Sequence, residues 1–396
     1  AGTVKLSKDG TGLVAVTGAN TYSGGTEILQ GTLQVGKGGS TGSLGSGPVF
    51  LGAGDFGTNG SNVGTLRVDR SGVLAMGQVI SGPGNVEMRG TGELRLSGAN
   101  TWEGVTVVRQ GTLTADLSAV DNVLPVNAGY ALEGGTLRIV GRATGESVQS
   151  FAPANVAQTN VSGTGAGAGT ASFNVQGGNI VGDNNGGTLT VSLPNTLTRA
   201  TGGSVDFAAV GSGVTKFLTG VANSNGILGG TTSAYATMNG VSWAVQSGGE
   251  VTGLAASGYN TAAGHLDVPA GTVPIAGGTV AATARFNAAG GTIADLSAGT
   301  STLSQGGVLV TAGVGAAPTV IRNGTIATGG NELLVHQHNT AGSLEISAVI
   351  GGTQSIVKAG AGLLILTGAN TATGSTHINH GLSLIHISEP TRQAEI

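Results

Sequence analysis

One stretch of about twenty residues occurs three times in this chain. It reads VAVTGANTYSGGTEILQGTL from Val14 to Leu33, LRLSGANTWEGVTVVRQGTL from Leu94 to Leu113, and LILTGANTATGSTHINHG from Leu364 to Gly381. A Gly-x-Gly turn precedes each copy, at Gly10/Gly12, Gly90/Gly92 and Gly360/Gly362. Internal repeats of this kind indicate a repeat architecture before any single residue is considered.

The unit itself alternates short strands with corners. Val14 and Val16 alternate with small or polar residues, which is typical of a strand with one buried face. The following Gly-Ala-Asn-Thr ends that strand, because Gly and Asn tolerate the backbone angles of a tight corner. Thr26 and Ile28 form a second strand, and Leu33 begins a third after another Gly. The unit therefore predicts one coil of a parallel β-solenoid.

This unit resembles the passenger-associated transport repeat, also called the autotransporter-associated β-strand repeat, of bacterial surface proteins. The shared pattern is L-x-L-[ST]-G-A-N-T-[YW]-x-G-x-T-x-[IV]-x-x-G-T-L. The copies with Tyr22 and Trp102 match it nearly throughout, and these aromatic rings would cover the corner, whereas the third copy has Ala372 there. The resemblance implies a secreted or surface-displayed right-handed parallel β-helix, with a C-terminal translocator or anchor missing from this sequence.

Composition agrees with a solenoid and excludes other classes. Of 396 residues 76 are Gly, and only 9% are charged, where about 25% is usual. A layered α/β domain is excluded by this balance, and a disordered chain is excluded by the 39% hydrophobic content. A narrow column of stacked aliphatic side chains with Gly-rich corners fits both the low charge and the hydrophobic content.

Charge and hydropathy give further limits. The net charge of −4 provides no electrostatic footprint for nucleic acid. No run of about 20 apolar residues is present, so we predict no membrane-spanning helix. No signal peptide is visible at Ala1, and the sequence is expected to begin inside the solenoid. The absence of Cys is neutral evidence.

We predict a single elongated domain over residues 1–381, with repeats at 10–36, 90–115 and 360–381. Gly-Thr-apolar corners also punctuate the more degenerate middle, residues 116–335. Residues 145–160 and 253–265 are the predicted inserted loops, and Ser162 to Ala171 is a low-complexity segment.

The last fifteen residues, 382–396, do not follow the pattern. They read LSLIHISEPTRQAEI, without Gly and with several charges, and Leu-Ser stands where the repeat expects Thr-Leu. The peptide resembles a translated sequencing-library adapter, so we predict a non-native tail that stays outside the core. Its apolar residues could still pair with the exposed edge of the terminal coil.

Candidate ligand groups have plainer interpretations. His336 and His338 share one face of a predicted strand, but a zinc or copper site needs further ligands, so we expect an exposed polar pair. His377 and His380 are expected on a variable face of the third repeat. Residues 182–187, GDNNGG, match no calcium loop and are expected to form a corner.

A glycoside hydrolase needs two carboxylates about 5–10 Å apart, and a lyase of this fold clusters its acids. Here the acids are scattered, and no D-x-D or D-D pair precedes the tail. They include Asp55, Asp69, Asp116, Asp121, Asp183, Asp206, Asp267 and Asp295. We therefore assign no catalytic, cofactor-binding or metal-binding residue and expect no cofactor.

The sequence predicts an all-β, right-handed parallel β-helix. Its predicted function is that of a non-enzymatic stalk or passenger at the bacterial cell surface or outer membrane, or outside the cell, with adhesive or matrix-forming roles toward an unidentified host-surface, glycan or matrix ligand. The alternative is a polysaccharide lyase or hydrolase with its cleft in residues 116–335. The predicted inward residues are Val14, Val16, Ile28, Leu33, Leu94, Leu96, Val108, Leu113, Leu364, Leu366 and Ile378.

Overall fold

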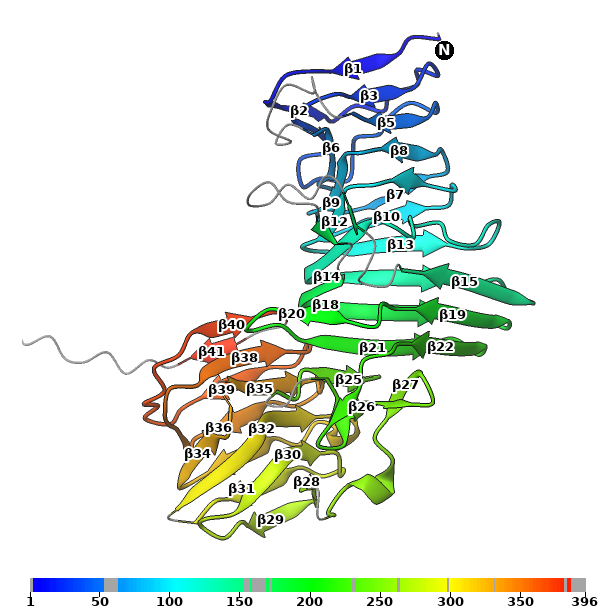
Figure 1. The fold of residues 1–396 in the computed structure, drawn as a ribbon. Helices are drawn as coiled ribbons and strands as arrows, with labels where there is room; N and C mark the ends of the chain where they lie inside the picture. Colours follow the sequence, from blue (N-terminus) through cyan, green and yellow to red (C-terminus); the bar gives the residue numbers. More distant parts are fainter. Residues whose placement is uncertain are drawn as a thin grey trace, which may run out of the picture. The chain divides into compact units, whose positions relative to one another are not determined.

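The computed structural model describes residues 3–52, 63–151, 157–158, 169–170, 173–229, 233–261, 264–297, 299–330, 332–380 and 383–385. Regular structure in them is almost entirely strand, with two short 3-10 helices, η1 (Ala256–Gly258) and η2 (Ala312–Val314), so the all-β prediction is confirmed. The chain divides into two compact units (Figure 1). Unit 1 contains Ala1–Thr201, Phe207–Val221 and Gln246–Val251, and unit 2 contains Gly202–Asp206, Ala222–Val245 and Thr252–Ile396.

Unit 1 winds around three sides, each a stack of parallel strands. Side 1 consists of β1 (Leu6–Lys8), β3 (Thr26–Ile28), β5 (Val49–Leu51), β8 (Ile80–Gly82) and β11 (Thr101–Trp102). Side 2 consists of β2 (Leu13–Val16), β4 (Thr32–Val35), β6 (Thr65–Val68), β9 (Asn85–Met88), β12 (Val105–Val108) and the first half of β14 (Gly129–Val140). Side 3 consists of β7 (Val73–Met76), β10 (Glu93–Leu96), β13 (Thr112–Asp116) and the second half of β14.

Further strands complete this unit. Both halves of β14 pair with β18 (Phe173–Asp183), and β15 (Glu146–Ser150), β19 (Thr188–Ser192) and β22 (Val214–Leu218) form another parallel ladder. The remaining strands here are β16 (Ala157–Gln158), β17 (Gly169–Thr170), β20 (Leu197–Arg199), β21 (Val205–Val210) and β27 (Glu250–Gly253).

Unit 2 repeats the architecture with its own parallel stacks (Figure 1). One sheet has the strand order β28 (His265–Val268), β30 (Val280–Phe286), β32 (Thr300–Val310), β35 (Glu332–Gln337), β38 (Ser355–Ala359) and β40 (Thr376–Ile378). In the same sheet β32 also pairs with β34 (Thr325–Thr328), and β34 pairs with β37 (Val349–Ile350). The other runs β29 (Gly271–Pro274), β31 (Thr292–Asp295), β33 (Thr319–Arg322), β36 (Leu344–Ile346), β39 (Leu364–Leu366), β41 (Ser383–Ile385). Two antiparallel pairs precede them, β23 (Asn223–Ser224) with β24 (Ile227–Leu228) and β25 (Ala236–Met238) with β26 (Ser242–Ser247).

Each sequence repeat closes one coil, as predicted. The strand that opens the repeat lies beside the strand that ends it, so Val14 is opposite Leu33 and Leu94 is opposite Leu113. The first two copies occupy different sides: repeat one uses sides 1 and 2, whereas β9–β12 and β10–β13 of repeat two lie on sides 2 and 3. The repeat thus specifies a coil, but not which side it starts on.

Side-chain amides join successive coils at the first corner of the repeat. Asn100 donates from Nδ2 to the Gly98 and Val123 carbonyls at 2.8 and 2.9 Å and accepts at 2.8 Å from the Ile80 amide one coil earlier. In repeat three the Asn370 oxygen accepts from the Ile350 amide at 2.8 Å. The asparagine of the repeat therefore satisfies backbone groups that the corner leaves unpaired.

Most predicted inward residues are buried, namely Ile28, Leu33, Leu94, Leu96, Val108, Leu113, Leu364 and Leu366. Val16 is half-buried, and the prediction is wrong for Val14 and Ile378, which are 46% and 52% exposed. Among the described strands β2 pairs only with β4, and β40 pairs only with β38. Ile28 is the residue of repeat one that corresponds to Ile378. It is buried because its strand lies between β1 and β5, with a neighbouring coil on both sides.

The parallel stack is also interrupted where we predicted one continuous domain. The β25–β26 hairpin reverses the chain through Asn239, Gly240 and Val241, and the first two lie at φ 57° and 61°, a region that Asn and Gly tolerate. Residues 146–150 form strand β15 rather than the predicted loop, whereas 253–265 is mostly irregular around η1. Most of 152–168 lies outside the described residues.

Residues 383–385 of the predicted tail form β41, which pairs in parallel with β39. Its register is that of the repeat, with Ser383 opposite Leu364. The tail was expected to stay out of the core, although edge pairing was foreseen. Residues 386–396 lie outside the described residues, and the non-native origin of the tail stays a prediction.

Candidate functional site

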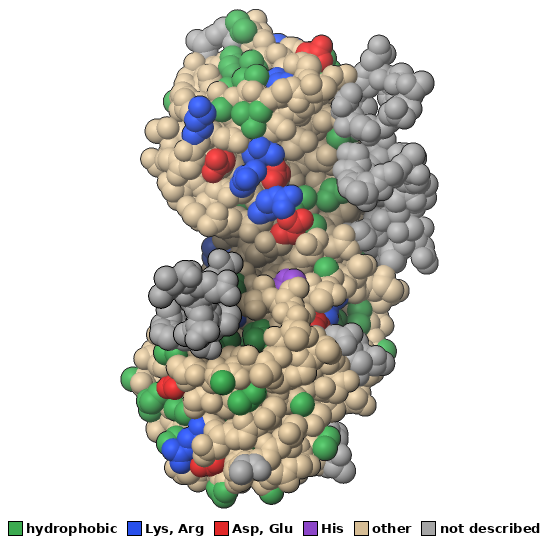
Figure 2. All heavy atoms as spheres, turned by 90° about the vertical axis from the view of Figure 1, so that its left-hand side faces the viewer, with side chains coloured by type: hydrophobic (Ala, Val, Ile, Leu, Met, Phe, Trp, Pro, Cys, Tyr) green, Lys and Arg blue, Asp and Glu red, His purple; other side chains and the backbone are tan. Residues whose placement is uncertain are grey.

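Charged side chains of both signs follow one another across the coils of unit 1 (Figure 2). Arg67 Nε lies 2.5 Å from Glu87 Oε2, Arg109 Nε lies 2.8 Å from Glu87 Oε1, and Arg109 also pairs with Glu133. Burial opposes ionisation of Glu87, but the hydrogen bonds from Arg67 and Arg109 outweigh it and lower the pKa of this carboxyl. These ion pairs therefore connect successive coils and stabilise the charged form of Glu87.

The scattered aspartates of the middle region are individually bound. Ion pairs with arginines hold Asp116 (Arg95, 3.9 Å), Asp121 (Arg142, 2.7 Å), Asp183 (Arg138), Asp267 (Arg285, 2.6 Å) and Asp295 (Arg322, 3.1 Å). Asp206 accepts hydrogen bonds from the Thr237 hydroxyl and the Gly240 amide at 2.7 and 2.8 Å, and Asp69 accepts from Gln34 at 3.3 Å. Asp55 lies outside the described residues.

Two of these acids have lowered pKa values. The Asn323 amide group, the Ser297 amide and Arg322 lower the pKa of Asp295. For Asp121, desolvation acts in the opposite direction, but the Val148 amide and Arg142 outweigh it and the pKa is again lowered. A general acid for glycoside cleavage needs a raised pKa, so these carboxylates are poorly suited to that role.

His336 and His338 lie on one face of the chain at β35, and their rings stack with centroids 6.2 Å apart. The prediction of an exposed pair is wrong, because His336 is buried and His338 is half-buried. The cause is a covering layer: His336 Nε2 lies 2.9 Å from the Ala234 carbonyl, and the Trp243 ring contacts His336 edge-on at 5.5 Å. Burial lowers the pKa of His338 although Asp206 opposes this, so His338 is neutral at pH 7.

The other candidates are structural. His377 is half-buried beneath Gly202, and His380 is exposed. The 182–187 loop is a corner, as predicted, in which Asn184 Nδ2 donates to the Gly187 and Val214 carbonyls at 2.6 and 2.9 Å. Within the described residues no group of three or more His, Cys, Asp or Glu side chains could hold a metal ion.

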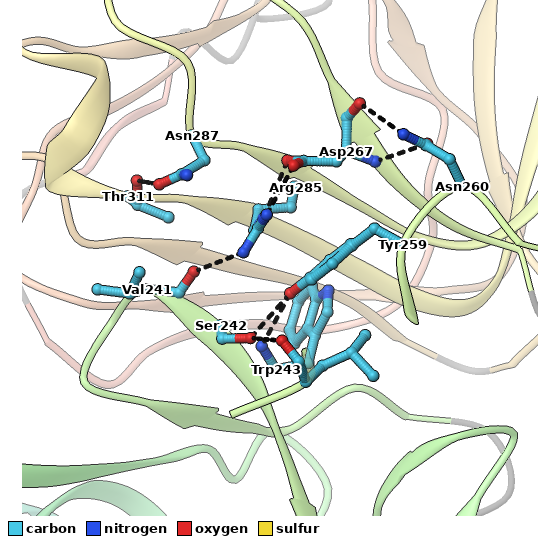
Figure 3. A network of polar contacts seen from close by, with 10 residues as sticks. Val241, Ser242, Trp243, Tyr259, Asn260, Asp267, Arg285, Asn287 and Thr311 are labelled. Atoms are coloured by element: carbon cyan, nitrogen blue, oxygen red, sulfur yellow. Dashed lines mark hydrogen bonds and ion pairs between the residues drawn. The ribbon is translucent and has the colours of Figure 1, made fainter. Parts of the chain in front are cut away.

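The site that the sequence did not reveal is a polar network on the outer surface of unit 2 (Figure 3). Arg285 on β30 forms a bidentate pair with Asp267 on β28, at 2.9 and 2.6 Å, and donates to the Val241 carbonyl at 3.3 Å. Its guanidinium lies 3.7 Å from the centroid of the Tyr259 ring. The Tyr259 hydroxyl is 3.0 Å from that of Ser242. This network attaches a chain segment to the sheet from outside.

We call residues 222–229, 233–245 and 252–261 the covering segment. Its Ile227, Ala234, Trp243 and Tyr259 form a small apolar cluster with Leu309 of β32. The cluster lies outside the main core of this unit, so β32 is buried on both faces. In the sequence, only the Asn-Gly dipeptide at 239–240 indicated a hairpin in this segment. No periodic sequence pattern predicts the contact between Tyr259 and Arg285.

Asn260 closes the free edge of β28. Its backbone amide donates to the His265 carbonyl at 2.7 Å, its side-chain oxygen accepts from the Asp267 amide at 3.0 Å, and its Nδ2 is 3.5 Å from the Asp267 carbonyl. Asn260 is itself in the left-handed region, at φ 54°. One residue thus occupies backbone groups that another strand would use.

An apolar cavity of about 40 Å³ lies inside unit 2. Its lining includes Ala284, Phe286, Leu303 and Ser301. Ser301 is buried, and its hydroxyl has no hydrogen-bond partner within the described part of the chain. The core is therefore incompletely filled here.

Comparison with known proteins agrees with this geometry. The family model "Passenger-associated-transport-repeat" matches residues 6–35, 86–115 and 356–382, the three coils described above. The chain is 28% identical over 421 aligned positions to the Adhesin BmaC autotransporter of Brucella suis biovar 1 (strain 1330), an alignment that covers 96% of this chain.

The chain contains three passenger-associated transport repeats and is similar to an autotransporter adhesin. These similarities support a location outside the cell or at the cell surface in association with the outer membrane. The segment spans 11% of the length of the Brucella adhesin. No solved structure matches the chain. The part of this passenger that the structure describes contains no helix of sufficient length and apolar character to cross a membrane.

Proposed function

We propose that this passenger segment is a non-enzymatic stalk that displays a ligand-binding surface. The observation that carries the proposal is the coincidence of each passenger repeat with one complete coil, Val14 opposite Leu33 and Leu94 opposite Leu113. A stack of such coils gives an extended scaffold whose outer residues are free to vary. The similarity to a protein named an adhesin supports an adhesive role, toward a host-surface, glycan or matrix ligand.

We further propose that the covering segment carries the contact surface. It is the part of unit 2 where the chain leaves the coil path, and the Arg285 network holds it in place. Val241 at its hairpin is 46% exposed. Loops held on a rigid scaffold are where binding residues concentrate.

The test measures binding of the purified chain to cultured epithelial cells, a glycan array and immobilised matrix proteins. Val241→Asp should reduce binding at least several-fold without a change in Tm. Val73→Asp is the matched control, because Val73 is an exposed valine of unit 1 and its substitution should leave binding unchanged. Equal effects of the two variants would contradict the assignment to the covering segment, and binding to none of the surfaces would contradict the adhesive role.

The absence of enzymatic activity is also part of the proposal. It is supported by the arginine-paired aspartates and by the lowered pKa values of Asp121 and Asp295. The alternative, a polysaccharide lyase or hydrolase with its cleft in residues 116–335, predicts release of new chain ends from a polysaccharide panel. Any turnover by the purified chain that is lost in Asp121→Asn or Asp295→Asn would overturn the non-enzymatic reading.

A further inference from the structure

Two lysines occupy the same position of the repeat and are buried in the same way. Lys8 is 5% exposed and Lys358 is 1% exposed. Lys8 lies opposite the buried Ile28, and Lys358 lies opposite Val335 of the core. A buried ammonium group without acceptors is strongly destabilising, so the surroundings of these two lysines require an explanation.

Each ammonium group donates to three backbone carbonyls, and the two sets of acceptors are equivalent. They belong to the next two residues and to the residue 22 positions later in the chain. The distances from Nζ are 2.9, 2.6 and 3.0 Å to Asp9, Gly10 and Gln30, and 3.0, 2.5 and 3.1 Å to Ala359, Gly360 and His380. All three N–H donors of each ammonium are therefore used.

The Gly-x-Gly turn shapes this group of oxygens. Gly10 and Gly360 lie in the left-handed region, at φ 74° and 77°, where a residue with a side chain would be strained. The third oxygen comes from the next corner of the same coil, so the ammonium joins the two corners. Burial lowers the pKa of Lys358 to about 8, and the group is protonated at pH 7.

Repeat two provides a natural variant of this corner. Met88 stands at the lysine position and is fully buried. The corresponding Gly90 does not adopt the left-handed region. The left-handed glycine and the lysine thus occur together in repeats one and three, and repeat two has neither.

We propose that the Gly-x-Gly corner is a binding site for an ammonium group, built from three backbone oxygens. In repeats one and three the site holds the lysine of the same repeat. If that lysine is shortened, the site takes an alkylammonium ion from solution. Repeat two contains the same Gly-x-Gly sequence and can adopt the site when its methionine is replaced by lysine.

The first test shortens Lys358 to alanine in the full chain at pH 7. The site should then bind n-propylammonium, which restores the missing carbons and nitrogen. We expect Lys358→Ala to lower Tm by about 5 °C and n-propylammonium to recover most of the loss. We expect no recovery of Tm with sodium at equal ionic strength, with n-propanol or with tetramethylammonium, because none of these has an N–H donor.

Lys358→Met is the matched control, since it places the side chain of repeat two at this corner. It should not respond to n-propylammonium, and neither should the unsubstituted protein. Equal recovery by n-propanol, or an equal response of Lys358→Met, would overturn the proposal.

The second test is independent of whether Lys358→Ala folds. Met88→Lys places an ammonium group at the corner of repeat two, and we expect Tm to change by less than about 3 °C. Met76→Lys is the control, because Met76 is buried on β7 without a Gly-x-Gly turn after it. That variant should lose about 10 °C or more, and an equally large loss in Met88→Lys would contradict the proposed site.

Discussion

The indole nitrogen of Trp102 donates a hydrogen bond to the hydroxyl of Thr106 at 3.0 Å, and both side chains are buried. Repeat one makes the same contact with Tyr22 and Thr26, whose hydroxyls are 2.7 Å apart. In repeat three Ala372 replaces the aromatic residue, and Thr376 is exposed. The aromatic ring and the threonine of the repeat therefore act as a pair that closes one corner of the coil.

Trp102→Ala should lower the free energy of unfolding by about 3–5 kcal/mol, because it removes a large buried side chain and leaves the Thr106 hydroxyl without its donor. Trp102→Phe keeps most of the volume and should cost about 1–2 kcal/mol. Urea unfolding followed by circular dichroism measures both. Tyr22→Ala is the control and should cost less than Trp102→Ala, since Tyr22 is only half-buried; the reverse order would refute this account.

Ser301→Val should stabilise the protein by about 1 kcal/mol. The substitution removes a buried hydroxyl without a partner and adds a methyl group to the apolar cavity of unit 2. The measurement is the midpoint of thermal unfolding. Thr300→Val at an exposed position of the same strand should have little effect, and a destabilised Ser301→Val would show that the hydroxyl has a stabilising role.

Glu87 should make stability depend on pH in the acid range. Its folded-state pKa is lowered from the ordinary value of 4.5, so the unfolded chain binds the proton more tightly. The stabilisation from this carboxylate is complete above pH 4.5 and is lost as the pH falls through the lower folded-state value. The difference in Tm between the unsubstituted protein and Glu87→Gln should thus be larger at pH 7 than at pH 3.

The exposed Glu103 provides the control for that measurement. Glu103→Gln should differ little from the unsubstituted protein at either pH. If the effect of Glu87→Gln were the same at pH 3 and pH 7, the Arg67 and Arg109 pairs would not be stabilising the charged form.

Asn260→Gly should increase self-association. Glycine keeps the left-handed backbone but removes the amide that bonds the backbone of Asp267 at the edge of β28. An uncovered strand edge is a template for pairing with a second chain. Light scattering over a concentration series measures the effect. Asn225→Gly, also at a left-handed residue, is the control, and equal behaviour of the two variants would rule out edge protection by Asn260.

Deletion of residues 382–396 should leave Tm within about 3 °C of the full chain, as is usual for a chain end with few contacts. This expectation rests on the predicted non-native origin of the tail, and we make it although Ser383–Ile385 pair with β39. A loss beyond about 2 kcal/mol would show that the tail contributes to the fold.

The sequence was sufficient to predict the coil, because register and burial there depend on local order. The alternation of Leu94 and Leu96 and the corner at Gly98 place each strand, and the partner Leu113 lies in the same repeat. The same local pattern could not show that Val14 and Ile378 are exposed, because their burial depends on whether another coil lies beside them.

The covering segment could not be predicted in this way. Arg285, Asp267 and Tyr259 come together only because the chain folds back over the outside of β28 and β30, and this return path has no period. The burial of His336 follows from the same path, since Ala234 and Trp243 reach it from a distant part of the sequence. Asn239-Gly240 marked the turn, but a turn alone does not identify the surface against which the hairpin packs.

The shift of one side between repeats one and two has an evolutionary consequence. Unequal recombination between the two copies would remove 80 residues and join the first half of one repeat to the second half of the other. The hybrid would still close a coil, because Val14 of its first strand can lie opposite Leu113 of its last strand in the register that the pairs Val14–Leu33 and Leu94–Leu113 share. Every coil after the junction would, however, be turned to the neighbouring side. A single genetic event would therefore shorten the chain and rotate the outer surface of the coils after the junction, without any substitution in the residues of that surface.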